Sequence, residues 1–252
     1  MKRFALPLTV LFTLCVLCGC ESDEPDEPNG PGLFAVAVVA KNIPVSDIQA
    51  CEIPELFAAN RIQYNSVSIL NWPVQYPYMP QVDFAVAHNG SSMLIHYRVT
   101  EKRTVGTMED DLDDVYKESC CELFCMEQGD SLYYNIESNC IGSILMECGS
   151  NRSDRETSTE ENLEQIDRWS SLGRSAVGTI PHQTHWELAL AVPVSAFWQH
   201  SYGTLDGKIF LANIYNCVGG GDDRQYVTWR PIDAEAPDFH RPEYFHRIYF
   251  IR

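Results

Sequence analysis

Apolar residues occupy every second position in several stretches of this chain. In residues 93–99 the odd positions are apolar, while His96 and Arg98 lie between them. Residues 186–192 alternate in the same way around Glu187. Because successive side chains of a β-strand point to opposite faces, a period of two predicts strands with one buried face. The alternation therefore favours a chain that builds its core from strands.

Further segments have the length and composition of strands, and turn-forming residues separate them. These strands are predicted at Val82–His88, Cys120–Met126, Leu132–Ser138, Ile141–Glu147, Ile209–Cys217, Tyr226–Trp229 and Phe245–Ile251. The 14 Pro and 15 Gly fit many short strands and turns better than a helical bundle. No repeat of about 20–50 residues is visible, which argues against solenoids and propellers. The pattern predicts an all-β, antiparallel β-sandwich.

Helices are predicted at two places, both at the periphery of the sandwich. Ser158 followed by Glu161 forms a capping box, and Leu163, Ile166 and Trp169 would continue it as an apolar stripe. A second short helix is predicted after Pro193.

The charge balance excludes some classes of partner. The chain carries 18 Lys and Arg against 35 Asp and Glu, a net charge of −17. Nucleic acids and acidic membrane surfaces would therefore repel it, because both are bound through clustered basic residues. The hydrophobic share of 45% excludes disorder for most of the chain.

The N-terminus has the features of an export signal. Lys2 and Arg3 precede an apolar run that ends at Leu17, which is shorter than the roughly 20 residues a membrane-spanning helix needs. Leu17-Cys18-Gly19-Cys20 resembles a bacterial lipobox, in which the final Cys is lipidated. Residues 1–20 are thus predicted to be a lipoprotein signal peptide with Cys20 as the lipidation site. An ordinary signal peptide cut nearby is the alternative.

A short polar segment follows Cys20. Residues 21–32 are acidic and rich in Pro and Gly, which predicts a solvated tether before a single domain at 33–252. Acidic residues directly after the lipidated Cys resemble the export signal of surface lipoproteins in glycan-degrading Gram-negative bacteria. The predicted location is the cell outer membrane, with the lipid as the only membrane contact and the protein exposed at the surface.

Seven cysteines follow Cys20, namely Cys51, Cys120, Cys121, Cys125, Cys140, Cys148 and Cys217. An odd number cannot pair completely within one chain, and several lie in apolar runs where Cys acts as a small hydrophobe. Buried thiols are the favoured interpretation, with one or two disulfides as the alternative. The Cys121-x3-Cys125 spacing does not match zinc sites, so no metal site is predicted.

Several segments together resemble one family. They are Asn71–Pro80, Glu118–Phe124, Tyr133–Gly142, Leu211–Tyr215, Trp229–Ile232 and Pro237–Phe245. In order and spacing they resemble the carbohydrate-binding family 9-like domains, from about Trp72 to Phe250. This resemblance implies a β-sandwich of the jelly-roll or DOMON-like kind that binds sugars without cleaving them. It implies an oligosaccharide or polysaccharide as the partner and no cofactor, although related modules carry structural calcium.

The resemblance also implies a site. In the family a sugar ring lies between two aromatic walls, which correspond here to Tyr116 and to Phe239 in the segment Phe239-His240-Arg241-Pro242. Glu122 matches the family's strand glutamate, and Glu137 stands where an Arg is expected. The full predicted carbohydrate-binding set is Tyr116, Phe239, Glu122, Asn135, Glu137, Asn139 and Arg241.

The residues support such a site on their own chemistry. Sugars need flat aromatic faces and charged or amide partners for their hydroxyls. Asn135, Glu137 and Asn139 share one strand face by the period of two. The competing interpretation is that Glu122 and Glu137 face solvent and that Phe239 and Tyr116 pack in the core. Trp72 and Trp229 are interpreted as core or rim residues.

Three functions remain open at this point. The first is non-catalytic carbohydrate binding by a surface lipoprotein that serves polysaccharide capture. The second is a glycoside hydrolase-type enzyme, with Glu122 and Glu137 as acid and base. The third is a structural lipoprotein that has lost the sugar site. Two acidic segments, 109–114 and 219–223, could bind calcium but are interpreted as solvated charge runs.

Overall fold

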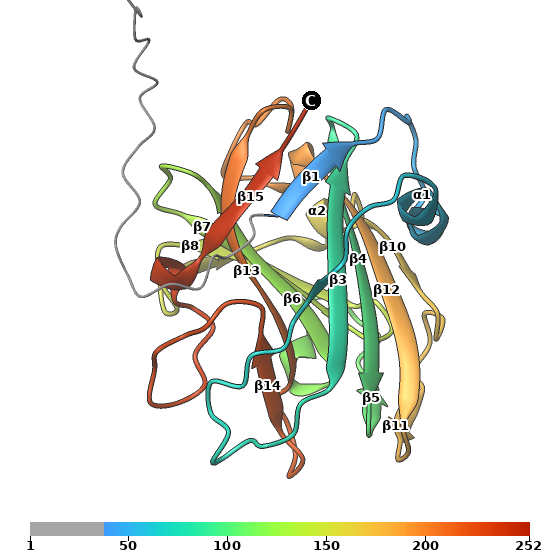
Figure 1. Cartoon of the computed structure of the whole chain (residues 1–252), viewed down its shortest axis with the longest axis vertical. Coiled ribbons are helices and arrows are strands. Elements are labelled where there is room, and N and C mark those ends of the chain that lie inside the picture. The colour runs from blue at the N-terminus through green and yellow to red at the C-terminus, as the bar shows by residue number, and fades with distance from the viewer. Residues whose placement is uncertain (1–37) are drawn as a thin grey trace, which may run out of the picture. The chain divides into compact units, whose positions relative to one another are not determined.

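The computed structural model describes residues 38–252, and the predicted signal peptide, Cys20 and tether lie outside these residues. Two curved sheets face one another to form a sandwich (Figure 1). The all-β class predicted from the alternation is confirmed. Within the described residues, no helix is both long and apolar enough to cross a bilayer.

The first sheet contains the strands with the clearest alternation. Its members are β2 (Asn65–Ser66), β3 (Gln81–His88), β4 (Ser92–Glu101), β10 (Asp167–Ser170) and β12 (Thr184–Pro193). They pair in the order β10-β12-β4-β3, with β2 on β3. A separate small ribbon pairs β5 (Thr104–Gly106) with β11 (Gly178–Ile180).

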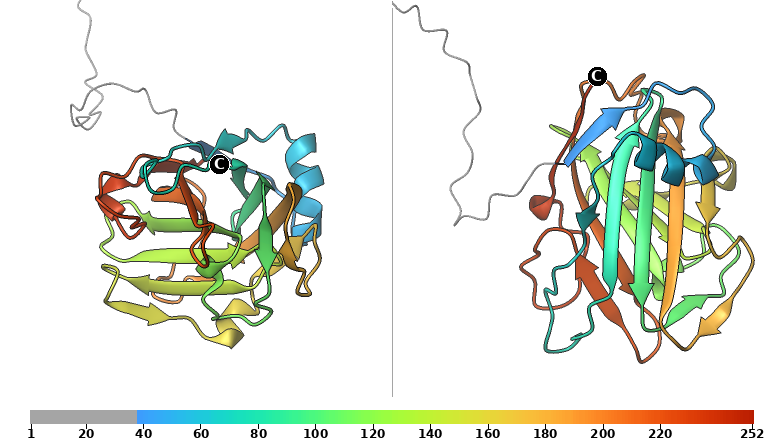
Figure 2. Two further views of the ribbon diagram at one scale, coloured as in Figure 1. Left: turned by 90° about the horizontal axis from the view of Figure 1, so that it is seen from below. Right: turned by 45° about the vertical axis from the view of Figure 1, so that its right-hand side comes forward.

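The second sheet carries the remaining strands. They are β6 (Cys120–Glu127), β7 (Tyr133–Asn139), β8 (Ile144–Gly149), β9 (Arg155–Thr157), β13 (Ile209–Val218), β14 (Gln225–Thr228) and β15 (His246–Phe250). The order is β15-β13-β6-β7-β8-β9, with β14 also on β13. Figure 2 shows the two layers edge-on.

One strand joins the two sheets and departs from the prediction. Strand β1 (Val38–Asn42) pairs with β3 in one sheet and with β15 in the other, in parallel both times. All other strand pairs within residues 38–252 are antiparallel. The fold is therefore an antiparallel sandwich with one parallel strand at the junction of its sheets.

The main core fills the space between the sheets. Val86, Ile95 and Leu188 of the first sheet contribute to the same buried cluster as Leu123 and Ile136 of the second. Ile95 and Leu188 belong to the stretches whose alternation predicted strands, and the burial of the whole cluster provides the main driving force for pairing the sheets.

The predicted helices need correction. Helix α2 (Glu160–Leu163) is a single turn capped by Thr159, whose side chain accepts the Asn162 amide at 3.2 Å, so Ser158 is not the cap. Trp169 lies in β10 instead of continuing the helix. The chain leaves the helix after Leu163 because it pairs with β12 from residue 167 onward. After Pro193 there is only a 3-10 turn, η3 (Val194–Ala196).

The longest described helix escaped prediction. Helix α1 (Ile53–Ala59), preceded by the 3-10 turn η1 (Ala50–Glu52), packs on the outer face of the first sheet through Ile53 and Phe57. Pro54 in the first turn and the i, i+4 spacing of the two apolar residues are signals that could have found it.

The cysteines agree with the buried-thiol interpretation. All seven within residues 38–252 are free thiols, and all are buried except Cys51. Trp72 and Trp229 are also buried, in agreement with their interpretation as core or rim residues.

Candidate functional site

The two faces of the second sheet differ in chemistry. Along β6, Cys121 and Leu123 point into the main core, whereas Cys120, Glu122 and Phe124 point to the outer face. An outer face of a sandwich is normally solvated. Here, however, the loops of the same sheet fold over it, so that the polar side chains of this face are buried.

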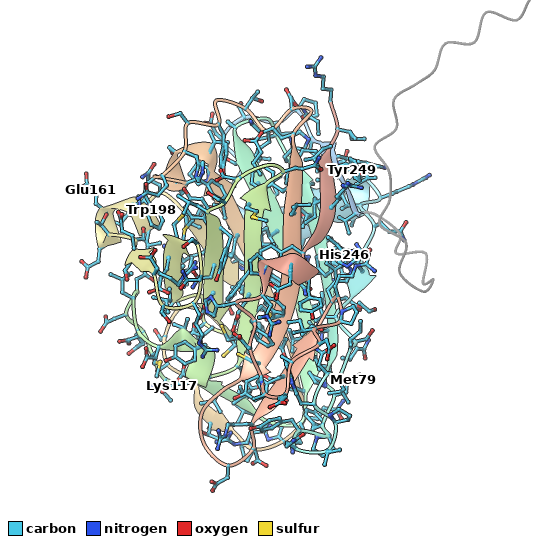
Figure 3. All side chains as sticks on the ribbon, turned by 90° about the vertical axis from the view of Figure 1, so that its left-hand side faces the viewer. Met79, Lys117, Glu161, Trp198, His246 and Tyr249 are labelled. Carbon is cyan, nitrogen blue, oxygen red and sulfur yellow. The ribbon has the colours of Figure 1, made fainter. Side chains whose placement is uncertain are left out.

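The covering segments come from distant parts of the sequence. They include three segments: the 3-10 turn η2 (Val115–Lys117), residues 219–226, and residues 237–245. The last contains the 3-10 turn η4 (Pro242–Tyr244). Figure 3 looks onto this side of the molecule, with Lys117 near one end and Tyr249 near the other. Side-chain contacts hold the loops in place, such as the Arg152–Asp238 ion pair at 3.0 Å.

A cavity of about 280 Å³ lies between the outer face and these loops. Its walls are Tyr116, Glu122, Phe124, Glu137, Leu145, Glu147, Arg152, Cys217, Gly219, Tyr226, Pro237, Phe239 and His240. The volume is at the lower end of small-molecule sites, which suits a ligand of one or two rings better than a long chain segment.

Four of the predicted site residues meet in this cavity. Tyr116, Glu122, Glu137 and Phe239 all line it, although 123 positions separate Tyr116 from Phe239 in the sequence. Tyr116 remains 37% exposed, so that one of its faces is available. The structure thus brings four of the seven predicted residues together around one cavity.

The other three predicted residues do not line the cavity. Asn135 lies two residues before Glu137 on the same face of β7, where its amide donates to Glu137 Oε1 at 2.8 Å. Asn139 lies at the end of β7 and donates to the Met108 carbonyl at 2.8 Å. Arg241 turns away and pairs with Glu243 at 2.7 Å. Asn135 and Asn139 share a strand with Glu137, and Arg241 shares a loop with Phe239, but none of the three lines the cavity.

Glu122 and Glu137 are buried, which corrects the interpretation that they face solvent. They are only 2% and 4% exposed. Their backbones are direct partners across the β6–β7 pairing. Burial raises the pKa of Glu137 to about 7. Burial, with Cys217 and Glu137 nearby, raises the pKa of Glu122 well above its usual range.

One atom of Glu137 is directly relevant to binding. Oε1 accepts the Asn135 amide, whereas the buried Oε2 has no hydrogen-bond partner among residues 38–252. A buried acceptor without a partner costs free energy. Since Glu137 lines the cavity, a ligand hydroxyl could donate to it and remove this cost.

Phe239 is part wall and part core. Its ring stacks on Tyr215 at a centroid distance of 4.1 Å and 5° between planes, and the Tyr215 hydroxyl donates to its carbonyl at 3.1 Å. Trp72 and Tyr226 also touch it, and only 8% of it is exposed. Phe239 therefore belongs to both the core and the site: its contacts with core residues hold it in place, and it also forms part of the cavity wall.

Two charged or ionisable residues of the cavity, Arg152 and His240, were not among the predicted site residues. Arg152 lies in the β8–β9 turn, and His240 follows Phe239. Burial, together with Arg155 and Arg152, lowers the pKa of His240 to about 3, so it is neutral near pH 7. Its Nδ1 lies 2.9 Å from the Tyr133 hydroxyl. No local motif marks Arg152, and His240 lies in the family-like segment Phe239-His240-Arg241-Pro242 but was given no role there.

The acidic segments considered for calcium have other partners. In residues 109–114, Asp111 pairs with Arg168 at 2.6 Å and Glu109 accepts the Ala176 amide at 2.9 Å. In residues 219–223, Asp223 faces Lys102 at 3.5 Å. These carboxylates point to separate partners within the protein, in agreement with ordinary charge runs.

Comparison with known proteins identifies the family of this chain. The family model for carbohydrate-binding family 9 matches residues 51–250. This chain therefore belongs to carbohydrate-binding family 9, a family of non-catalytic carbohydrate-binding modules. No curated protein shows a significant match to it.

Solved structures support the same fold. A Bacteroides uniformis protein proposed to bind carbohydrate is 35% identical, with a TM-score of 0.82 over 85% of this chain and 98% of its own. A family 9 module from Caldicellulosiruptor kristjanssonii in complex with cellotriose superposes with a TM-score of 0.50 at 11% identity, over 85% and 93% of the two chains. The second likeness shows a shared fold only.

Proposed function

We propose that this protein binds a carbohydrate, without cleaving it, in the cavity between the second sheet and its covering loops. The observation that carries the proposal is that Glu137, whose buried Oε2 has no hydrogen-bond partner within residues 38–252, lines one small cavity together with the aromatic residues Tyr116 and Phe239. Pyranose rings present apolar CH faces to aromatic rings and hydroxyls to charged groups. Family membership and the cellotriose complex of a structural neighbour support the same ligand class.

The arrangement of the carboxyls favours binding over hydrolysis. Glycosidases place an acid and a second carboxylate on opposite sides of the scissile bond. Glu122 and Glu137 are instead direct neighbours on adjacent strands, and both belong to the same wall of the cavity. Carboxyls on one wall of the cavity are placed to accept hydroxyls from one side of a sugar, and this placement supports binding.

We further propose that the protein is held at the outer membrane surface through a lipid on Cys20. Support comes from the lipobox-like Leu17-Cys18-Gly19-Cys20 and from the acidic segment that follows it. A sugar-binding domain on such a tether would capture polysaccharide at the cell surface. Incorporation of labelled palmitate into the wild-type chain and not into Cys20→Ala would support the anchor, and equal labelling would refute it.

A glycan array with Leu33–Arg252 tests the binding function, since this segment contains every described strand. The tightest glycan is then titrated against Tyr116→Ala, with Tyr249→Ala as the control because Tyr249 lies on β15 outside the cavity. We expect binding to weaken about 10-fold or more in Tyr116→Ala, since an aromatic contact contributes about 1 kcal/mol beyond its buried area. Unchanged affinity in Tyr116→Ala would refute the site.

A further inference from the structure

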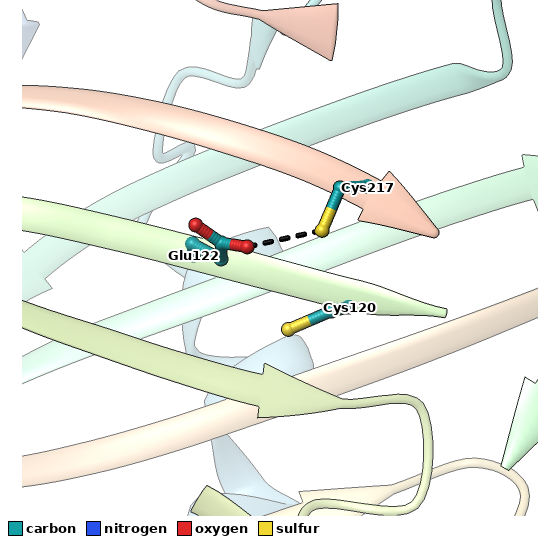
Figure 4. A group of neighbouring side chains, drawn as sticks. All are labelled: Cys120, Glu122 and Cys217. Carbon is teal, nitrogen blue, oxygen red and sulfur yellow. Dashed lines mark hydrogen bonds between the residues drawn. The ribbon is translucent and has the colours of Figure 1, made fainter. Parts of the chain in front are cut away.

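Three metal-binding side chains lie together at one end of the cavity. Cys120 and Glu122 are two positions apart on β6 and therefore share the outer face of the sheet. Cys217 of β13 is the direct pairing partner of Cys120. Figure 4 shows the three side chains pointing toward one another from these two strands.

The ligand atoms are close enough to share one ion. The two sulfurs and a carboxylate oxygen of Glu122 all lie within 4.8 Å of one another. Cys217 Sγ lies 3.0 Å from Glu122 Oε1, where the thiol donates to the carboxylate. In a tetrahedral zinc site, with bonds of about 2.0–2.3 Å, neighbouring ligand atoms are about 3–4 Å apart. A small adjustment of these side chains would therefore complete three corners of a tetrahedron.

The burial of this group distinguishes it from a surface cluster. Cys120, Glu122 and Cys217 are at most 2% exposed. The contact of Cys120 Sγ with the Cys121 carbonyl, at 3.8 Å, is too long for a strong hydrogen bond. By contrast, Cys121 and Cys125 of the same strand point to the opposite face and pack among apolar side chains of the main core.

We propose that Cys120, Glu122 and Cys217 form a binding site for a transition-metal ion of the zinc class. Thiolates select zinc and other soft or borderline ions over calcium, which prefers six to eight oxygen ligands. Glu122 and Cys217 line the cavity, so the fourth corner faces it and is open to water or to a ligand oxygen. The metal site shares Glu122 with the proposed sugar site, but metal binding does not require a sugar.

Binding exchanges protons for the ion. The two thiols each release one proton and form metal–sulfur bonds, and the Glu122 carboxyl releases its proton where it holds one. Three anionic ligands on a divalent ion leave one net negative charge, which the neighbouring positive charge of Arg152 attracts. No oxidant or reductant takes part.

Cobalt(II) added to the reduced, chelator-treated protein is the direct test. We expect one equivalent to bind with sulfur-to-cobalt charge-transfer bands and visible bands of tetrahedral intensity, and zinc to displace it. Cys217→Ser should lose affinity by about 100-fold or more, because a direct ligand matters at least as much as an outer-shell partner. Cys125→Ser is the matched control, a buried free thiol of the same strand outside the site, and should bind as the wild type does.

Glu122→Gln gives a second readout in case the serine variant misfolds. It keeps both sulfurs and nearly the same shape, so the charge-transfer bands should remain while cobalt binds about 10-fold more weakly. Absence of sulfur-to-cobalt bands in the reduced wild type would overturn the proposal. So would unchanged binding in a folded Cys217→Ser. A Cys120–Cys217 disulfide in the isolated protein, with no metal bound after reduction, would overturn it as well.

Discussion

The two faces of strand β6 show how one segment can serve both the core and a site. On the inner face, Leu123 and Cys125 are buried among apolar side chains between the sheets. On the outer face, Glu122 is equally buried but faces a cavity with an ionisable neighbour, Glu137. Burial of the first kind stabilises the fold, whereas burial of a carboxyl costs free energy unless it gains partners. The same degree of burial therefore stabilises the fold on the inner face and costs free energy on the outer face.

The largest expected effect comes from the inner face. Leu123→Ala should lower the free energy of unfolding by about 2–5 kcal/mol, because it removes buried methyl groups and leaves a cavity in the main core. Denaturant titration measures this change. The glycan affinity of folded Leu123→Ala should equal that of the wild type. A loss of affinity in the fully folded variant would contradict the claim that the inner face contributes to stability and not to binding.

A substitution on the outer face should lower glycan affinity and not stability. Glu137→Gln replaces one carboxyl oxygen with a neutral amide nitrogen, so above the Glu137 pKa of about 7 a charge-assisted bond to a sugar hydroxyl is lost. We expect affinity for the best array glycan to fall about 10-fold or more, since such bonds contribute about 1.5–3 kcal/mol. The free energy of unfolding should be unchanged or higher, because a buried ionisable group is removed.

A buried glutamate elsewhere supplies the control for this prediction. Glu101 is 0% exposed and accepts hydrogen bonds from Trp186 at 2.8 Å and from Gln225 at 3.1 Å, outside the cavity. Glu101→Gln should change the free energy of unfolding and leave the glycan affinity unchanged. Equal loss of affinity in Glu101→Gln and Glu137→Gln would show that the effect is structural and not local to the site.

A further effect concerns His240 and is absent at neutral pH. Its pKa is about 3 in the folded protein against 6.5 for the free side chain, so the unfolded chain binds a proton first as pH falls below about 6.5. Its neutral burial therefore costs stability progressively between about pH 6.5 and 3. In His240→Gln, the difference in unfolding free energy between pH 7 and pH 4.5 should be smaller than in wild type. His182→Gln, an exposed loop variant, should show the wild-type difference.

The fold was largely predictable because its signal is local. Alternation along residues 93–99 and 186–192 predicted β4 and β12, whose inner faces fill the core. The parallel strand β1 was not predicted, because its pairing with β3 and β15 depends on contacts distant in sequence. Helix α2 was predicted too long, since the pairing of β10 with β12 competes for the residues that follow it.

The site was predictable only where a strand or a family motif marked it. Glu122, Glu137, Tyr116 and Phe239 were found in this way and meet in the cavity. Period-two alternation placed Asn135, Glu137 and Asn139 on one strand face, but it could not show that loops cover that face. Arg152 and His240 were missed for the same reason, because their positions follow from loop packing and not from strand geometry.

The crystal structure of a complex with the tightest array glycan tests the central claim most directly. The account predicts a sugar ring in the cavity, with its face against Tyr116 or Phe239 and a hydroxyl within hydrogen-bond distance of Glu137 Oε2. A glycan bound on any other surface, with the cavity closed by its own loops, would contradict it.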